Sequence, residues 1–282
     1  MVLRVAFKAQ VSLLVGSLAL GACSANDAGN IRYLGTPVTE PVAIMKNTVN
    51  VTINSQNGGL LIDTASDSDK VLVSAQPFAI APGNEDGRKA ALALMANAAS
   101  GPQFSATSGT DGVSIISAGS PSTGWDLTVH LPNPYHGLLA ATVANGNVTY
   151  LAAPNSTSAT FDVGVGDIDV ENVGNQLTIR AGVSNVLLVT SGTLSGPDPK
   201  GKPVAPSSVS TKVGNITAKI PDAASLTITA TSGKNGVVRA QADQDVTLLS
   251  PDGRSQRIII GDGTSGTLQV STGDGDIVFL RP

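Results

Sequence analysis

Apolar and polar residues alternate with a period of two on both sides of a Gly-Asp pair, most clearly over residues 161–170. This stretch reads Phe-Asp-Val-Gly-Val-Gly-Asp-Ile-Asp-Val. Every second residue before Gly166 is apolar, and Ile168 and Val170 resume the pattern after Asp167. The alternation predicts two short strands, each with one apolar face, that are joined by a tight turn.

The arrangement around Gly166 recurs along the chain. Its counterparts are Gly146, Gly214 and Gly275, with Ser184 in a fainter copy, and the clear glycines are spaced by 20, 48 and 61 residues. A unit of roughly 20 residues with insertions fits these spacings and lies in the period range of solenoid repeats. We therefore predict an all-β fold, a single-stranded parallel β-helix or β-solenoid. An antiparallel sandwich of hairpins, which also alternates, is the alternative.

The residues between the paired strands have turn chemistry. Glycine tolerates positive φ, and Asp and Asn side chains accept hydrogen bonds from turn amides. The predicted structural corners are Gly146, Gly166, Asp167, Gly214, Gly275 and Asp276. Because the alternation runs up to each corner, Val165, Val183 and Val213 are expected to point into the core.

Composition narrows the class of protein. The chain has 282 residues, a net charge of −4 and 3% aromatic residues. Few aromatic residues suit thin stacked sheets, and scarce Lys and Arg argue against a nucleic-acid partner. With one cysteine, the chain cannot form an internal disulfide.

The first residues have the features of a processing signal. Arg4 and Lys8 precede an apolar run that is too short to span a membrane, and Leu20-Gly21-Ala22-Cys23 resembles a bacterial lipobox. We predict a signal peptide over residues 1–22 and lipidation of Cys23, which would attach the chain to a membrane. Ser24 after the cysteine favours the outer membrane of the cell envelope, by analogy with lipoprotein sorting. A plain secretory signal is the alternative.

The rest of the chain is predicted to contain a tether and one domain. Residues 23–47 are polar with two prolines and predict a tether, and residues 48–282 predict the solenoid domain. Within that domain, Asn84 as an N-cap and the alanine-rich run after it predict a helix over residues 84–99, packed against the solenoid or binding a partner. Four prolines over residues 192–208 predict an exposed loop. The last strand, just before Pro282, is expected at an open end without a cap.

Two runs of the chain resemble a known family. They are residues 125–132, Trp-Asp-Leu-Thr-Val-His-Leu-Pro, and residues 268–279, Leu-Gln-Val-Ser-Thr-Gly-Asp-Gly-Asp-Ile-Val-Phe, together with the corners at Gly146, Gly166 and Gly214. This pattern resembles the bacterial "putative adhesin" family, a β-solenoid domain of unknown function, over roughly residues 48–282. The resemblance implies a fold and an adhesin-like role. It implies no catalytic residues.

Candidate catalytic and metal-binding residues are few. His130 and His136 are the only histidines, and no nucleophile elbow, HExxH motif or phosphate loop occurs, so no catalytic residue and no cofactor are predicted. The carboxylates near the corners, Asp167, Asp169, Asp274 and Asp276, are expected to form turns; calcium binding there is an alternative. Trp125 is expected to pack in the core, with a sugar-binding platform as the alternative.

These observations predict a lipid-anchored envelope protein of structural or interaction type, adhesin-like and without catalytic activity. Its partners are expected to be the membrane, through Cys23, and an unidentified protein or surface; self-assembly along the flat faces is the alternative to a protein partner. The alternatives are a carbohydrate-active or carbohydrate-binding β-helix protein and a calcium-stabilised envelope scaffold.

Overall fold

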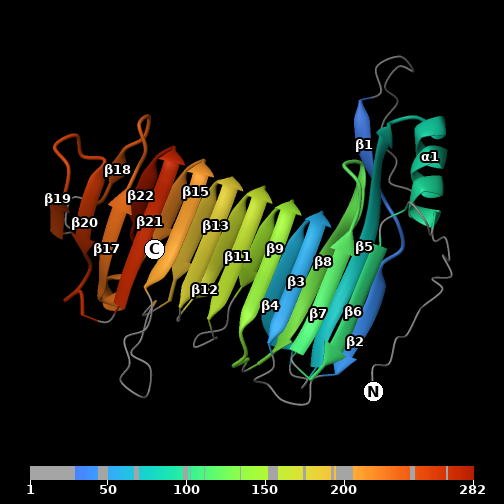
Figure 1. Cartoon of the computed structure of the whole chain (residues 1–282), viewed down its shortest axis with the longest axis horizontal. Helices are drawn as coiled ribbons and strands as arrows, with labels where there is room; N and C mark the ends of the chain where they lie inside the picture. The colour runs from blue at the N-terminus through green and yellow to red at the C-terminus, as the bar shows by residue number, and fades with distance from the viewer. Residues whose placement is uncertain are drawn as a thin grey trace.

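The computed structural model describes residues 29–43, 50–66, 70–97, 101, 103–110, 112–133, 135–151, 158–173, 176–191, 194, 206–241, 245–264 and 266–282. The predicted signal peptide and Cys23 lie outside these residues. The described chain is almost entirely β-structure, with the helix α1 (Glu85–Ala96) and the short 3-10 helix η1 (Asp222–Ala224) (Figure 1).

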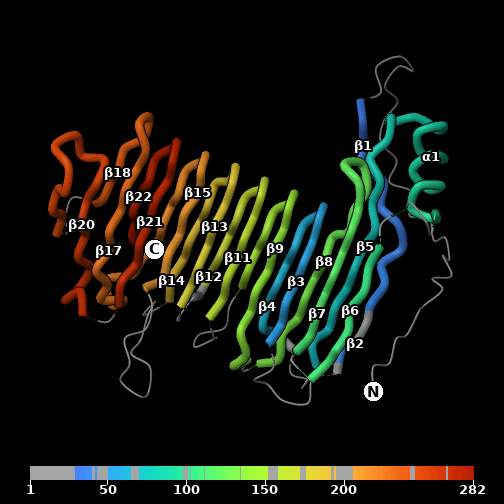
Figure 2. Tube along the Cα trace, viewed as in Figure 1, coloured from blue at the N-terminus to red at the C-terminus, as the bar shows by residue number. Residues whose placement is uncertain are grey.

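The described strands form two 11-stranded sheets that lie face to face (Figures 1 and 2). The first, called here the β10 sheet, has the order β1 (Asn30–Leu34), β5 (Lys70–Pro82), β8 (Thr123–Pro132), β4 (Leu60–Ser66), β10 (Val148–Leu151), β12 (Ile168–Val173), β14 (Val186–Thr190), β16 (Ile216–Lys219), β22 (Ile277–Leu280), β18 (Val238–Arg239), with β2 (Val38–Ala43) also paired to β5. The second, the β9 sheet, has the order β19 (Asp245–Leu248), β20 (Ser255–Ile259), β17 (Leu226–Thr231), β21 (Gly266–Asp274), β15 (Ser207–Val213), β13 (Leu177–Val183), β11 (Ala159–Val165), β9 (Leu139–Asn145), β3 (Val51–Asn57), β7 (Gly112–Ala118), β6 (Gln103–Gly109).

The centre of both sheets is built from repeated pairs of strands. A strand of the β9 sheet, such as β11, turns a corner and continues as a strand of the β10 sheet, such as β12; we call each such pair a two-strand unit. Equivalent residues of neighbouring units pair in parallel, so that Phe161 lies between Ala141 and Ile179. Because the same positions point inward in each unit, one continuous apolar core fills the space between the sheets.

The residue just before three of the corners is an exposed valine, although the alternation predicts that it is buried. Val165, Val183 and Val213 are 49%, 53% and 45% exposed, although every second residue upstream of them is buried. The prediction that these valines point into the core is therefore wrong. The chain has already begun to turn away from the sheet at these residues, so the strand periodicity no longer fixes where their side chains point.

The spatial order of the units differs from their order in the sequence. The unit β21–β22 lies between β15–β16 and β17–β18, although it follows both in the chain (Figure 1). Likewise, β3–β4 lies between β7–β8 and β9–β10. The last strand is therefore an interior strand, and the prediction of an open end at this point is wrong.

Antiparallel strands complete the described stack at both ends. At one end β17, β20 and β19 pair antiparallel, and at the other β5 pairs antiparallel with β1, β2 and β8, while β6 pairs with β7. The sheets are therefore mixed. The prediction of an all-β fold is confirmed, and parallel pairing describes its centre and not its ends.

The segment before the first predicted strand is structured. Residues 30–34 and 38–43 are β1 and β2, and both pair with β5. The prediction of a tether over residues 23–47 is therefore wrong for these residues, which have no sustained alternation to identify them as strands. Arg32 lies over the ring of Phe78, 3.6 Å from its centroid, and its guanidinium contacts Asp126 at 2.7 Å.

The predicted helix is present as α1. Asn84 caps it, because its side chain accepts a hydrogen bond from the Gly87 amide, and Glu85 and Asp86 lie in its first turn. The helix packs on β5 through Ala91, in a small second core with Ala79 and Ala81. It ends at Ala96, three residues before the predicted end. No helix within the described ranges is long and apolar enough to cross a membrane.

The predicted proline-rich loop lies mostly outside the described residues. Within residues 192–208, Leu194 is fully buried, and Ser207 begins β15 and donates a hydrogen bond to the Leu194 carbonyl. The prediction of a wholly exposed loop is therefore wrong at these two residues.

Candidate functional site

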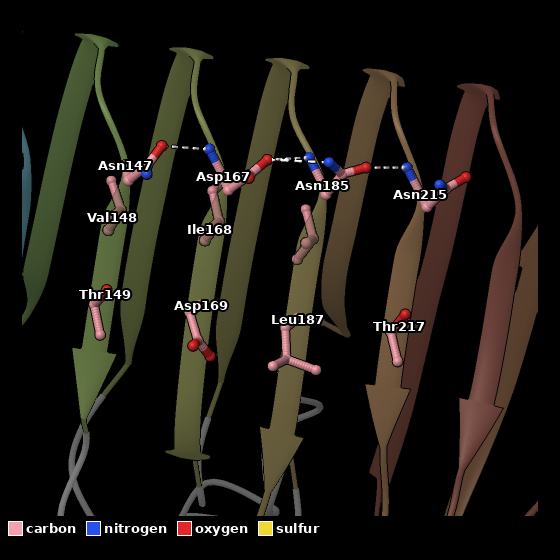
Figure 3. Close-up of a pocket in the computed structure, with 11 residues that line it drawn as sticks. Asn147, Val148, Thr149, Asp167, Ile168, Asp169, Asn185, Leu187, Asn215 and Thr217 are labelled. Atoms are coloured by element: carbon pink, nitrogen blue, oxygen red, sulfur yellow. Dashed lines mark hydrogen bonds between the residues drawn. The ribbon is translucent and has the colours of Figure 1, made fainter. Parts of the chain in front are cut away.

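The corners of the units form a continuous hydrogen-bonded ladder. At each corner an Asn or Asp side chain accepts a hydrogen bond from the backbone amide of the equivalent residue in the next unit. Figure 3 shows the corners from Asn147 to Asn215. The donor and acceptor pairs are Asp167 N to Asn147 Oδ1 (2.9 Å), Asn185 N to Asp167 Oδ1 (3.0 Å), Asn215 N to Asn185 Oδ1 (3.1 Å) and Asp276 N to Asn215 Oδ1 (2.8 Å). The ladder fixes the register of the corners and accounts for the recurrence of Asn and Asp at this position.

The glycines at the corners have the backbone conformation that glycine favours. Gly146, Gly166, Gly214 and Gly275 have φ values of 150°, 137°, 130° and 143°. A Cβ atom at Gly166 would lie 2.2 Å from the carbonyl oxygen of Gly146, so the backbones of adjacent units approach too closely for a side chain. Ser184, the counterpart in the fainter copy, is not among the described residues with positive φ; its hydroxyl donates a hydrogen bond to the Gly166 carbonyl at 2.5 Å.

The corner carboxylates accept hydrogen bonds from backbone amides. Asp167 Oδ1 accepts from the Asn185 amide, and Asp276 Oδ1 accepts from the Val237 amide at 3.1 Å. Calcium takes six to eight oxygen ligands. Within the described ranges, no group of three or more His, Cys, Asp or Glu residues could hold a metal ion. The geometry thus assigns these two carboxylates a turn-forming role.

A shallow groove follows the ladder on the outer face of the β10 sheet. Its floor is made by the outward residues Thr149, Asp169, Leu187 and Thr217 of four neighbouring strands (Figure 3). Asp169 Oδ1 is buried and makes no hydrogen bond within the described structure. The floor of the groove therefore combines hydroxyl, aliphatic and carboxylate side chains, and one oxygen of the carboxylate is buried without a donor.

The two histidines lie apart from this groove and from each other. His130 Nδ1 is 2.7 Å from Asp63 Oδ1 on the neighbouring strand, whereas His136 is exposed in the connection between β8 and β9. Trp125 is 9% exposed and packs against Phe104, with 5.4 Å between the ring centroids. Trp125 is thus a packing residue and not an exposed platform for a sugar ring.

The described carboxyl and hydroxyl groups with displaced pKa values belong to turns, caps and the core. Hydrogen bonds from Ser250 and from Thr264 lower the pKa of Asp252 and of Asp262, respectively, in the turns on either side of β20. Burial raises the pKa of the Tyr135 hydroxyl, which donates to the Leu138 carbonyl. The contact with Arg88 lowers the pKa of Glu85 in the first turn of α1. These shifts mark structural contacts.

Sequence reasoning found the corner residues but not the groove. The spacing of the glycines located the corners, and Asn147 and Asn215 align there with Asp167. Asp169, Thr149 and Leu187 carry no motif, since their proximity depends on the pairing of β10 with β12 and of β12 with β14. The available signal was their position in each copy, two residues after the Asn or Asp of the corner.

Comparisons with known proteins give similarity at the level of structure. No family model and no curated protein matches the chain. A "putative cell adhesion protein" from Clostridium sporogenes is similar, with a TM-score of 0.41 and 12% identity over 88% of this chain and 100% of that one. A "putative adhesin" from Bacteroides fragilis has a TM-score of 0.38 and 12% identity over 87% of this chain and 97% of that one.

The contribution of the ladder can be measured at Asn185, its central member. Asn185→Ala removes the acceptor of the Asn215 amide and a donor to Asp167, and is expected to lower the free energy of unfolding by about 1 kcal/mol. Asn54→Ala, the same chemical change at an exposed position on β3, is expected to change it by less than ~0.5 kcal/mol. Urea unfolding followed by circular dichroism measures both. Equal effects of the two substitutions would contradict a role for the ladder in stability.

Proposed function

We propose that this protein is a lipid-anchored protein of the bacterial cell envelope and acts as a non-catalytic, adhesin-like interaction module. In this proposal the paired sheets form a β-solenoid, and the lipid on Cys23 attaches it to the outer membrane. The observation that carries the proposal is the parallel stacking of equivalent corners from β3–β4 to β21–β22, because it creates long faces on which equivalent positions recur from strand to strand. Such faces suit binding to an extended partner or surface.

The distribution of charge supports binding over catalysis. Arg32 pairs with Asp126, Arg180 with Asp162, and Arg239 with Asp276, in contacts far apart along the stack. All six side chains are at least one third exposed. Polysaccharide cleavage requires a base beside a charge-stabilising group, or two facing carboxylates, in one site. The spread of these pairs along the stack favours an interaction role.

The order of residues 1–23 supports the anchor. A basic start, an apolar run and small residues precede the single cysteine of the chain. Lipid chains on a cysteine give stable attachment when more than one chain is present. If the anchored domain lies on the outer side of the outer membrane, it is exposed at the cell surface.

Trypsin treatment of intact cells tests the anchor and the orientation together. We expect cleavage after Lys200 or Lys202 in intact cells and recovery of the protein with the membrane fraction. Cys23→Ser should release the protein from that fraction, because no lipid can be attached. Membrane attachment that persists in Cys23→Ser would overturn the anchor. Cleavage that requires a permeabilised outer membrane would overturn surface adhesion and point to a periplasmic scaffold.

A further inference from the structure

One row of outward residues on the β10 sheet has a symmetric order. It crosses β10, β12, β14, β16 and β22 and consists of Leu151, Glu171, Val189, Lys219 and Leu280. Leu151 pairs with Glu171, and Val189, Lys219 and Leu280 pair in turn, whereas the register between β12 and β14 shifts after Val170, so that Glu171 lies at this irregularity. Val189 is the centre of this row. A glutamate lies on the strand on one side of it and a lysine on the strand on the other side, and a leucine follows each charge.

This order makes the face complementary to itself. A rotation of 180° about an axis along β14 places a second copy face to face with the first and reverses the row. Glu171 of one copy then faces Lys219 of the other, twice, and Leu151 faces Leu280. Both copies keep their strands aligned, as in one of the two common ways in which sheets pack. A patch that meets its own copy in this way defines a two-fold symmetric interface.

The neighbouring row of the same face obeys the same symmetry. Its residues are Thr149, Asp169, Leu187, Thr217 and Val278 on the same five strands. The rotation brings Asp169 of one copy opposite Thr217 of the other and places Leu187 opposite itself. This row therefore places a hydroxyl side chain opposite each Asp169 and a leucine opposite its own copy.

The two charges of the central row are available for such contacts. Within the described residues, neither Glu171 nor Lys219 takes part in an ion pair shorter than 4.0 Å. Their neighbours along the row are aliphatic, and Leu151 is 37% exposed. The helix α1 packs on β5 and β1, away from this part of the sheet. Charge pairs set among apolar side chains fix the register of an interface and exclude wrong pairings.

We propose that two copies of this chain associate through the outer face of the β10 sheet, about a two-fold axis along β14. The contacts are Glu171 with Lys219, Leu151 with Leu280, and Val189 with Val189. This dimer goes beyond the proposed envelope role and does not depend on it, because the complementary face belongs to the folded domain alone.

Sedimentation velocity of charge-reversed variants tests the dimer. The full-length chain carrying Cys23→Ser serves as the parent, so that neither lipid nor a disulfide through Cys23 contributes to association. We expect the parent to dimerise in the micromolar range. Glu171→Lys and Lys219→Glu should each raise the dissociation constant at least tenfold, because each variant sets like charges opposite each other twice.

Recombination of the two reversals gives the decisive result. A mixture of Glu171→Lys chains with Lys219→Glu chains restores both opposite-charge contacts, so the mixture should dimerise although each variant alone does not. The double variant Glu171→Lys/Lys219→Glu should dimerise like the parent for the same reason. These two rescues separate a specific contact from a general loss of folding.

Lys212→Glu is the matched control. Lys212 lies in the same two-strand unit as Lys219, but on β15 of the other sheet and exposed. Its reversal changes the net charge equally and should leave the dissociation constant unchanged. A parent that sediments as a monomer at about 100 micromolar would overturn the proposal. A mixture that stays monomeric, or a control as weak as Lys219→Glu, would overturn it as well, while leaving the anchor and the fold intact.

Discussion

Gly166→Val is expected to lower the free energy of unfolding by roughly 3–5 kcal/mol, since it combines backbone strain with a steric clash. Gly166 has φ of 137°, a value that a β-branched residue does not adopt without strain. Its Cβ atom would lie 2.2 Å from the Gly146 carbonyl oxygen and 2.5 Å from the carbonyl carbon. Relief would require adjacent units to separate where the corner ladder holds them together. Urea unfolding followed by circular dichroism measures the loss.

Gly109→Val is the matched control for this substitution. Gly109 ends β6 at the edge of the β9 sheet, and a Cβ atom there would meet no atom within 4 Å. We expect a change below ~0.5 kcal/mol at this exposed position. If both glycines tolerate valine equally, the close approach of neighbouring corners is not a constraint on the fold.

Removal of residues 265–282 is expected to have the largest effect of any change considered. These residues form β21 and β22, which provide the only pairing between the described units β15–β16 and β17–β18. Four fully buried side chains are lost with them, Leu268, Val270, Ile277 and Phe279. At 1.5–3 kcal/mol each, they contribute roughly 6–12 kcal/mol, which is comparable to the whole stability of a typical domain. The truncated chain should therefore lose the fold of residues 226–259.

Limited proteolysis checks this result directly. Trypsin should cut the truncated chain rapidly after Lys234 and Arg239, which lie in or beside β17 and β18, the strands that lose β21 and β22. Cleavage after Arg254 and Arg257 should follow, because β20 pairs with β17. A deletion of residues 245–259 serves as the control, because it removes β19 and β20 from the end of the stack and only two buried residues, Gln256 and Ile258. The control should keep the rest of the chain resistant. Equal resistance of the truncated chain and the full chain would show that β21 and β22 do not lie inside the stack.

The repeated units could be read from the sequence because local chemistry determines them. Each corner needs a residue that accepts positive φ and a side chain that accepts an amide, and Gly166 with Asp167 meets both needs in adjacent positions. The inward row is also determined by local sequence, since alternation separates the buried Phe161 and Val163 from their more exposed neighbours. For Val165 the alternation gives the wrong prediction, because the strand ends at this residue and a period of two contains no information about where a strand ends.

The order of the units could not be read in this way. Every unit presents the same apolar row to its neighbours, so Val270 of β21 could pair equally well, by pattern alone, at the end of the stack or within it. The arrangement of outward residues on the β10 sheet could not be predicted from the sequence for the same reason, because it depends on which strands are neighbours. Glu171 and Lys219 are separated by 48 residues in the sequence, and only the pairing of β12, β14 and β16 brings them to either side of Val189.

The interior position of β21–β22 has a consequence for how the molecule is made. Residues 226–239, which include β17 and β18, leave the ribosome before β21 and β22 have been synthesised. These two strands are the described link between β17–β18 and the rest of the stack. At 5–20 residues per second, the wait until residue 280 lasts roughly 2–8 s. During this time the units up to β16 can stack in the order of synthesis, while β17 and β18 remain unpaired with the growing stack. Once β22 has been synthesised, it pairs with β16 on one side and with the earlier strand β18 on the other. Until then, the edge of β16 that faces β22 in the folded protein has no partner strand.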